Sequence, residues 1–125
     1  MARLSAIAAD TEKGVIMWNE PGKEILDKIP KLYETETVSL KAKSIYIHFF
    51  IGGCDWYIAE YDGDNIFWGF VILGGDQFNA EWGYIPFSEL KEIRVKGVFE
   101  IDCEINWEPT RAGEIEKIRG CNGHW

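Results

Sequence analysis

A hairpin signal in the middle of the chain constrains the fold more than any other feature. Two segments rich in aromatic and β-branched residues, 56–61 and 67–73, are separated by the polar run Asp62-Gly63-Asp64-Asn65. Aspartate, asparagine and glycine favour the backbone conformations of tight turns. The pattern therefore predicts two neighbouring antiparallel strands joined by a short loop.

Further segments extend this hairpin into a meander of strands. Residues 44–51 are β-branched and aromatic and end at two glycines, and residues 81–85 form another short strand-like run. Helical turns are expected over residues 23–29, which Pro30 ends, over 89–93 with Ser88 as the N-cap, and over 114–119. The sequence predicts an α+β fold with an N-terminal helix, short helical turns and a curled, mostly antiparallel sheet of about five strands.

A chain of 125 residues is long enough for one hydrophobic core and too short for two. Residues 1–20 show no strong periodicity, so we expect a loosely attached leader, within which Met17 is an alternative start. Residues 21–119 are expected to form the single α+β domain, and residues 120–125 a tail. No segment carries the pattern of a secretion signal or reaches the about 20 apolar residues that span a bilayer, which predicts a cytoplasmic protein.

Residues 99–108 show the most regular alternation in the chain. On a strand, successive side chains point to opposite faces. The pattern predicts an apolar face with Phe99, Ile101, Cys103, Ile105 and Trp107, and an acidic face with Glu100, Asp102, Glu104 and Glu108. Such an acidic face is either a solvated sheet surface or a contact surface for a basic partner. The core is expected to contain Ile45, Ile47, Phe49, Ile58, Val71, Ile101 and Ile105.

The charge balance excludes some partners and favours others. The chain has 21 acidic and 13 basic residues and a formal net charge of -8. Such a charge repels nucleic acids and anionic lipids and attracts basic proteins. The many aromatic rings of the middle strands lack the positive groove that single-stranded nucleic acid needs. We therefore expect a protein interface, to which Glu81, Trp82 and Tyr84 contribute together with the acidic face.

No catalytic constellation, metal site or cofactor motif stands out. His48 lies in the middle of a strand and is expected to be packed or hydrogen-bonded rather than to act as a base. Cys121 and His124 are two potential zinc ligands where a structural site needs four. Three widely spaced cysteines make no disulfide framework, and Cys103 is expected to be buried. The sequence predicts a protein that is not an enzyme and needs no metal or cofactor.

Several short blocks follow one another along the chain: Ile29-Pro30-Lys31-Leu32-Tyr33, His48-Phe49-Phe50, Trp56-Tyr57 with Glu60 and Asp62, Phe67-Trp68-Gly69-Phe70-Val71, Glu81-Trp82-Gly83-Tyr84, Phe87-Ser88-Glu89-Leu90 and Trp107-Glu108-Pro109-Thr110. In this order they resemble a small domain-of-unknown-function family of bacterial conjugative elements, plasmids and phages. The resemblance covers residues 24–112, and the chain departs from the family pattern in its longer leader and at Cys54-Asp55.

The resemblance implies a mobile-element setting, and some similar proteins are associated with anti-CRISPR activity against Cas9. One expected function is therefore an acidic binding module that disables a basic nucleic-acid-processing protein such as an RNA-guided nuclease. The alternative is a small accessory enzyme or housekeeping factor of a conjugative element with an aromatic-lined pocket. A pocket with convergent polar groups favours the alternative, and a flat acidic face favours the binding module.

Overall fold

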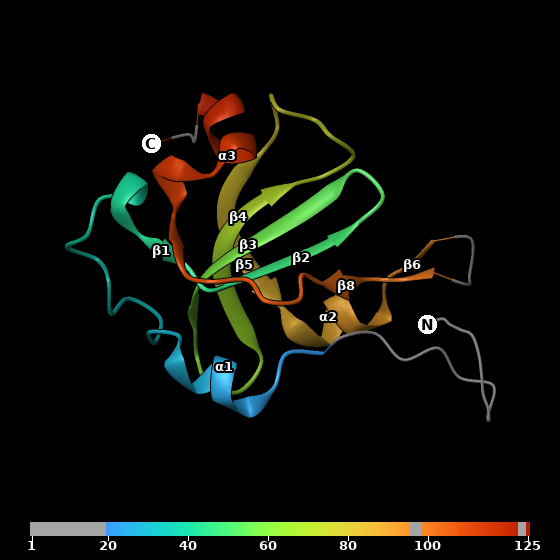
Figure 1. Ribbon diagram of the computed structural model, residues 1–125, viewed down its shortest axis with the longest axis horizontal. Helices are drawn as coiled ribbons and strands as arrows, with labels where there is room; N and C mark the ends of the chain where they lie inside the picture. The colour runs from blue at the N-terminus through green and yellow to red at the C-terminus, as the bar shows by residue number, and fades with distance from the viewer. Residues whose placement is uncertain (1–19, 96–98, 123–124) are drawn as a thin grey trace.

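The computed structural model describes residues 20–95, 99–122 and 125. Its centre is an antiparallel sheet in the order β5–β4–β3–β2–β8 (Figure 1). The predicted mixed α and β fold, with a mostly antiparallel sheet of about five strands, is confirmed. The strands are β1 Ser44–Ile45, β2 Ile47–Ile51, β3 Cys54–Tyr61, β4 Ile66–Ile72, β5 Glu81–Pro86, β6 Arg94–Val95, β7 Phe99–Glu100, β8 Asp102–Cys103 and β9 Thr110–Arg111. The helices are α1 Lys23–Lys28, η1 Leu40–Ala42, α2 Phe87–Glu92, η2 Ala112–Glu114 and α3 Glu116–Gly120.

The predicted hairpin is formed by β3 and β4, and one aspartate side chain builds its turn. Asp62 Oδ1 accepts hydrogen bonds from the backbone N–H groups of Asp64, Asn65 and Ile66, at 2.8 to 2.9 Å. Desolvation raises the pKa of Asp62, but these three donors outweigh it and hold the pKa below the usual value. Gly63 has a φ of 89°, which favours glycine. The local turn chemistry therefore fixes the hairpin as the sequence predicts.

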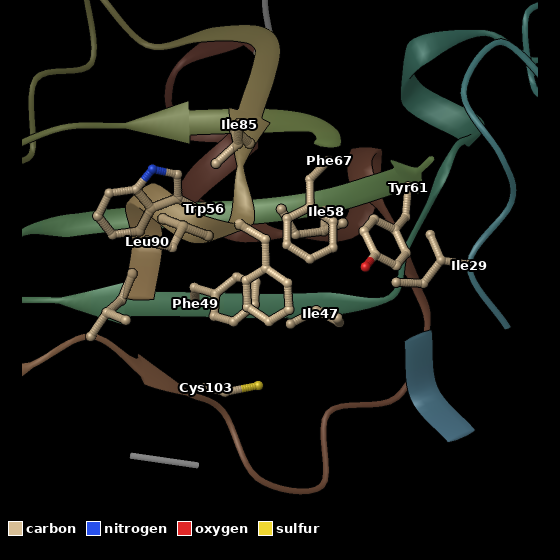
Figure 2. Packing of buried hydrophobic residues seen from close by; sticks show 12 residues of the cluster. Ile29, Ile47, Phe49, Trp56, Ile58, Tyr61, Phe67, Ile85, Leu90 and Cys103 are labelled. Carbon is tan, nitrogen blue, oxygen red and sulfur yellow. The ribbon is translucent and has the colours of Figure 1, made fainter. Parts of the chain in front are cut away.

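Helices cover both faces of the sheet (Figure 1). On one face, side chains of α1 and α2 pack against β2, β3 and β4 in a first core. Figure 2 shows Phe49, Ile58 and Phe67 in the middle of this core, with Ile29 beside Tyr61 at one end. The rings of Phe49 and Phe67 have centroids 5.7 Å apart and meet at a tilt, as aromatic pairs prefer.

A second core lies on the opposite face, under η2 and α3. Ala112 and Ile118 from this C-terminal part pack there with Tyr57 and Phe70 of the sheet. Cys121, which the sequence places in the tail, is buried in the same core. Of the predicted core residues, Ile45 is buried in this second core. Four others are buried in the first core, namely Ile47, Phe49, Ile58 and Ile101. Val71 is half-buried and packs against the first core.

The continuous strand predicted over residues 99–108 is wrong. β7 pairs with β6, and only the two residues of β8 pair with β2 before the chain turns at Ile105 and Asn106. Asn106 has a φ of 64°, a left-handed conformation that asparagine tolerates better than most residues. The turn leaves Ile105 65% exposed, so its predicted place in the core is also wrong.

The helix predictions are borne out in part. The helix expected over residues 23–29 corresponds to the six-residue α1. The predicted leader lies outside the described residues apart from Glu20. Ser88 is not an N-cap, because α2 begins at Phe87 after Pro86. The orphan N–H of Ser88 instead donates to Asn65 Oδ1 at 2.9 Å, so the β3–β4 turn caps this helix from outside.

Within the described part of the chain, no helix is long and apolar enough to cross a membrane.

Candidate functional site

The residues that the sequence proposes for partner binding lie on opposite edges of the sheet. Glu81 and Tyr84 are exposed on β5, which forms one edge, whereas β8 forms the other. Trp82 is half-buried and its ring stacks on that of Trp68, with centroids 5.0 Å apart. These side chains of β5 therefore lie at the opposite edge of the sheet from Asp102 of β8.

The acidic residues near β8 also differ among themselves. Asp102 is half-buried and its Oδ1 accepts the N–H of Cys103, whereas Glu108 follows the turn and is exposed. Glu104 is engaged, because its Oε1 lies 2.7 Å from His48 Nδ1. The side chain of Glu100 lies outside the described side chains. Asp102, Glu104 and Glu108 thus do not form the uniform acidic face that alternation predicts, because the chain turns between Glu104 and Glu108.

A cross-strand row of three side chains forms the floor of a pocket near the β5 edge. Trp68 of β4 pairs with Glu60 of β3 on one side and with Tyr84 of β5 on the other. Residues opposite each other on adjacent strands point to the same face. A register shift between Ile58 and Glu60 brings Glu60 into this row. The row therefore depends on a β-bulge in β3.

The loop that precedes η1 closes over this row and is held by Glu60. The buried carboxylate accepts the N–H of Tyr33 at 2.9 Å, and the N–H of Thr35 at 3.3 Å together with its hydroxyl. Lys43 is also buried, and its Nζ donates to the carbonyl and the hydroxyl of Thr35 and lies 3.9 Å from Glu60 Oε2. Glu60 and Lys43 thus compensate each other's charge and fasten the loop to the sheet.

The hollow between the loop and the row has a volume of about 510 Å³, within the range of small-ligand pockets. We call it the aromatic pocket. Its lining residues are Tyr33, Glu36, Val38, Ser39, Leu40, Lys43, Glu60, Trp68 and Tyr84.

Two tyrosines of the aromatic pocket are exposed. The hydroxyl oxygens of Tyr33 and Tyr84 lie 2.7 Å apart, and the two residues are 58% and 56% exposed. The hydrogen bond with Tyr33, and after it desolvation and the negative charge of Glu60, raise the pKa of Tyr84. The pocket therefore combines exposed aromatic surface with the carboxylates of Glu36 and Glu60 in its lining.

A second charged cluster lies on the same face of the sheet, near the start of β3. Asp55 and His48 are buried, and His48 Nε2 lies 2.7 Å from Asp55 Oδ1 while its Nδ1 faces Glu104. Both carboxylates can accept a hydrogen bond from the ring at the same time only when both ring nitrogens carry a hydrogen. Lys117 Nζ donates to both oxygens of Asp55, at 3.1 and 3.2 Å. We call these four residues the histidine cluster; they tie β2, β3, the end of β8 and α3 together.

An aromatic side chain packs against the histidine cluster. The His48 ring stacks on that of Tyr57 at 4.4 Å with an interplanar angle of 6°. Burial, and after it the charges of Asp55 and Glu104, raise the pKa of Tyr57, so its hydroxyl stays protonated. The prediction that His48 is a packed, hydrogen-bonded residue is confirmed. The charged groups of the cluster engage one another and thereby stabilise the fold.

Among the described residues, no group of three or more histidine, cysteine, aspartate or glutamate side chains is arranged to hold a metal ion. Cys54, Cys103 and Cys121 are free thiols. Cys103 is buried as predicted, and desolvation, and after it the charges of Asp102 and Glu104, raise the pKa of its thiol to about 12. A thiol of this kind is a poor nucleophile at neutral pH.

No protein-family model matches the chain, and no curated protein or solved structure shows significant similarity to it.

Reasoning from charge and alternation identified only Tyr84 among the side chains of the aromatic pocket. Tyr33, Glu60 and Trp68 belong to separate blocks of the family resemblance, so those blocks were the available signal. Neither alternation nor charge indicates that Glu60 and Lys43, which are 17 positions apart, form a buried pair.

Proposed function

We propose that the protein is a mobile-element- or phage-encoded binding module that acts in the bacterial cytoplasm on a basic, nucleic-acid-processing protein. An RNA-guided nuclease such as Cas9 is the partner that the family resemblance favours. Such nucleases hold their guide–target duplex in positively charged channels, which an acidic domain of 14.4 kDa can enter or block.

The distribution of acidic side chains carries this proposal. Asp55 and Glu60 are buried, and each lies within 4 Å of a lysine nitrogen. The other described acidic side chains are exposed or half-buried. With a net charge of -8, the surface is strongly negative and suited to fast, electrostatically steered encounters with a basic protein.

The exposed aromatic surface supplies the second part of a protein interface. Hot spots of interfaces are rich in tyrosine and tryptophan, which combine a large apolar area with a polar atom. Tyr33 and Tyr84 present such surface beside the exposed carboxylate of Glu36. We place the contact at this end of the sheet, because Glu104 near the other edge is already engaged by His48.

The proposal is tested by titrating the protein into RNA-guided DNA cleavage by purified Cas9. We expect cleavage to fall with added protein, and direct binding to weaken as salt rises from 50 to 300 mM because screening slows association. A net-neutral protein of similar size serves as the control. Full cleavage at saturating protein together with absent binding at 50 mM salt would contradict the proposal for this nuclease.

The alternative function, a small accessory enzyme, has one observation in its favour. The aromatic pocket holds two carboxylates, a lysine and two tyrosines within one hollow. Its buried carboxylate, however, accepts three hydrogen bonds from Tyr33 and Thr35, and Lys43 donates to Thr35. Groups that are committed to holding the loop are poorly placed to move protons. We therefore favour binding over catalysis at this site.

A further inference from the structure

The aromatic pocket has the chemistry of a cation site. We propose that it binds the guanidinium group of an arginine side chain. That this arginine belongs to the partner rests on the proposed function, whereas recognition of the guanidinium group is a property of the pocket alone. The proposal depends on the charges of the lining residues, on their rings and on the hydroxyl pair at the rim.

The charges of the lining residues favour a cation over an anion. Lys43 is the cation among the described lining residues, and Thr35 and Glu60 already engage it from within the protein. Glu36 is exposed, and its carboxylate has no ion-pair partner among the residues that the structure describes. The charge of Glu60 is compensated by Lys43, so Glu36 leaves the pocket with one net negative charge. An anionic ligand would meet repulsion there, and a cationic one attraction.

The rings favour a planar cation. A guanidinium group stacks on aromatic faces, and it is more weakly hydrated than an ammonium group. The ring of Trp68 is already engaged by Lys43 Nζ, 5.5 Å from its centroid, and by the stacked ring of Trp82. The exposed rings of Tyr33 and Tyr84 supply the aromatic surface for the ligand at the mouth. The volume of about 510 Å³ leaves room for one side chain of this size.

The hydroxyl pair at the rim supplies acceptors for the donors of such a ligand. Guanidinium carries five N–H donors and no acceptor. Tyr33 and Tyr84 share one hydrogen bond between their hydroxyl oxygens, which leaves lone pairs on both atoms. Together with the Glu36 carboxylate, they can accept several of the N–H groups. A neutral urea of the same shape offers fewer donors and no charge.

The test uses the full chain labelled with ¹⁵N and titrated with N-acetyl-arginine methylamide, monitored by NMR. N-acetyl-citrulline methylamide, in which a neutral urea replaces the guanidinium group, is the matched control ligand. We expect saturable shifts of the Tyr33, Trp68 and Tyr84 amides and of the Trp68 indole with the arginine probe, and at least fivefold weaker binding of citrulline. Equal binding of both probes, or no shifts at these residues, would overturn the proposal.

Variants of the pocket identify the groups responsible. Glu36→Gln keeps the shape and is expected to weaken arginine binding about two- to fivefold. Tyr84→Ala removes a ring and is expected to weaken it about three- to tenfold. Glu24→Gln, an equal charge change on exposed α1, is the control and should leave binding unchanged. Arginine binding that is insensitive to both pocket variants would contradict the assignment.

The titration needs no nuclease, so its failure differs from that of the proposed function. Guanidinium binding without any effect on Cas9 would support the pocket and contradict the nuclease as partner. Inhibition of Cas9 without guanidinium binding would overturn this inference and leave the proposed function standing.

Discussion

The aromatic pocket and the histidine cluster are two buried charged sites on the same face of one sheet. Asp55 and Glu60 lie on the same strand, about 16 Å apart by the rise of a β-strand. Each carboxylate is buried and lies within 4 Å of a lysine nitrogen. The two sites differ in what covers them: His48 and Tyr57 fill the space beside Asp55, whereas a loop bridges the space beside Glu60 and leaves a hollow.

This difference separates charge used for stability from charge that shapes the proposed binding site. In the histidine cluster, every member contacts another member, so removing one takes a partner away from its neighbours. In the aromatic pocket, Lys43 and Glu60 are likewise engaged in contacts within the protein, but Glu36 and the tyrosine rings line the hollow. Burial and ion pairing alone therefore do not distinguish the proposed binding site from a stabilising cluster. The aromatic pocket differs in having a hollow with exposed aromatic surface.

The largest expected effect is the loss of the carboxylate of Asp55. Asp55→Ala should lower the free energy of unfolding by about 3–5 kcal/mol, because it leaves His48 and Lys117 without their shared partner. Urea denaturation followed by tryptophan fluorescence measures this change. A loss below about 1 kcal/mol would mean that the histidine cluster does not hold the sheet and α3 together.

The histidine cluster should make the free energy of unfolding depend on pH. Desolvation raises the pKa of Asp55, but hydrogen bonds from His48 and Lys117 outweigh it, so its folded pKa lies below the ordinary 3.8. The carboxylate of Asp55 therefore binds a proton more readily in the unfolded chain than in the folded protein. The stabilisation is fully present above pH 3.8 and is lost as the pH falls through the folded pKa. Denaturation curves of wild type and Asp55→Asn between pH 2 and pH 6 should converge at the acidic end; a constant difference would contradict this.

Two glutamates of the predicted acidic face should now behave differently. Glu104→Gln keeps the shape but weakens the contact with His48, at an expected cost of about 1 kcal/mol in unfolding free energy. Glu108→Gln is the matched control on the exposed side of the turn and should change stability by less than about 0.5 kcal/mol. Thermal or urea unfolding of both variants distinguishes them. Equal effects of the two substitutions on unfolding free energy would indicate that both glutamates lie on one uniform acidic face.

The smallest expected effect on stability belongs to the aromatic pocket. Glu36→Gln should leave the free energy of unfolding within about 0.5 kcal/mol of wild type, because the residue is exposed and has no ion-pair partner among the described residues. The variant should still weaken binding of the arginine probe. A clear loss of stability would show that Glu36 holds the loop, as Glu60 does, and would remove the distinction between the two sites.

A structural feature could be predicted from the sequence when the residues that determine it lie close together in the chain. The β3–β4 hairpin was predictable because Asp62 and its three N–H donors lie within five residues. The strand over residues 99–108 was not, because its length depends on how much of β2 is available for pairing. β8 pairs only with Phe49 and Phe50, after which the chain turns and Ile105 leaves the core.

The aromatic pocket was harder to predict than the fold. The sequence predicted Tyr84 to be an interface residue. Its neighbours in the pocket, however, are placed by the bulge in β3 and by the loop before η1. A bulge of one residue decides whether Glu60 faces Trp68, and alternation of apolar and polar residues does not reveal it. Lys43 contacts Thr35 and Glu60 through the fold, so no local pattern indicates the pair.

The most direct test of the central claim, that the aromatic pocket and not the β8 edge is the binding surface, is the affinity for guide-loaded Cas9. Biolayer interferometry compares wild type, the double variant Glu36→Gln with Tyr84→Ala, and Glu108→Gln as the control at the other edge. We expect the double variant to bind about tenfold more weakly, chiefly through faster dissociation, and Glu108→Gln to bind within twofold of wild type. Undiminished binding of the double variant, with a marked loss for Glu108→Gln, would contradict the claim.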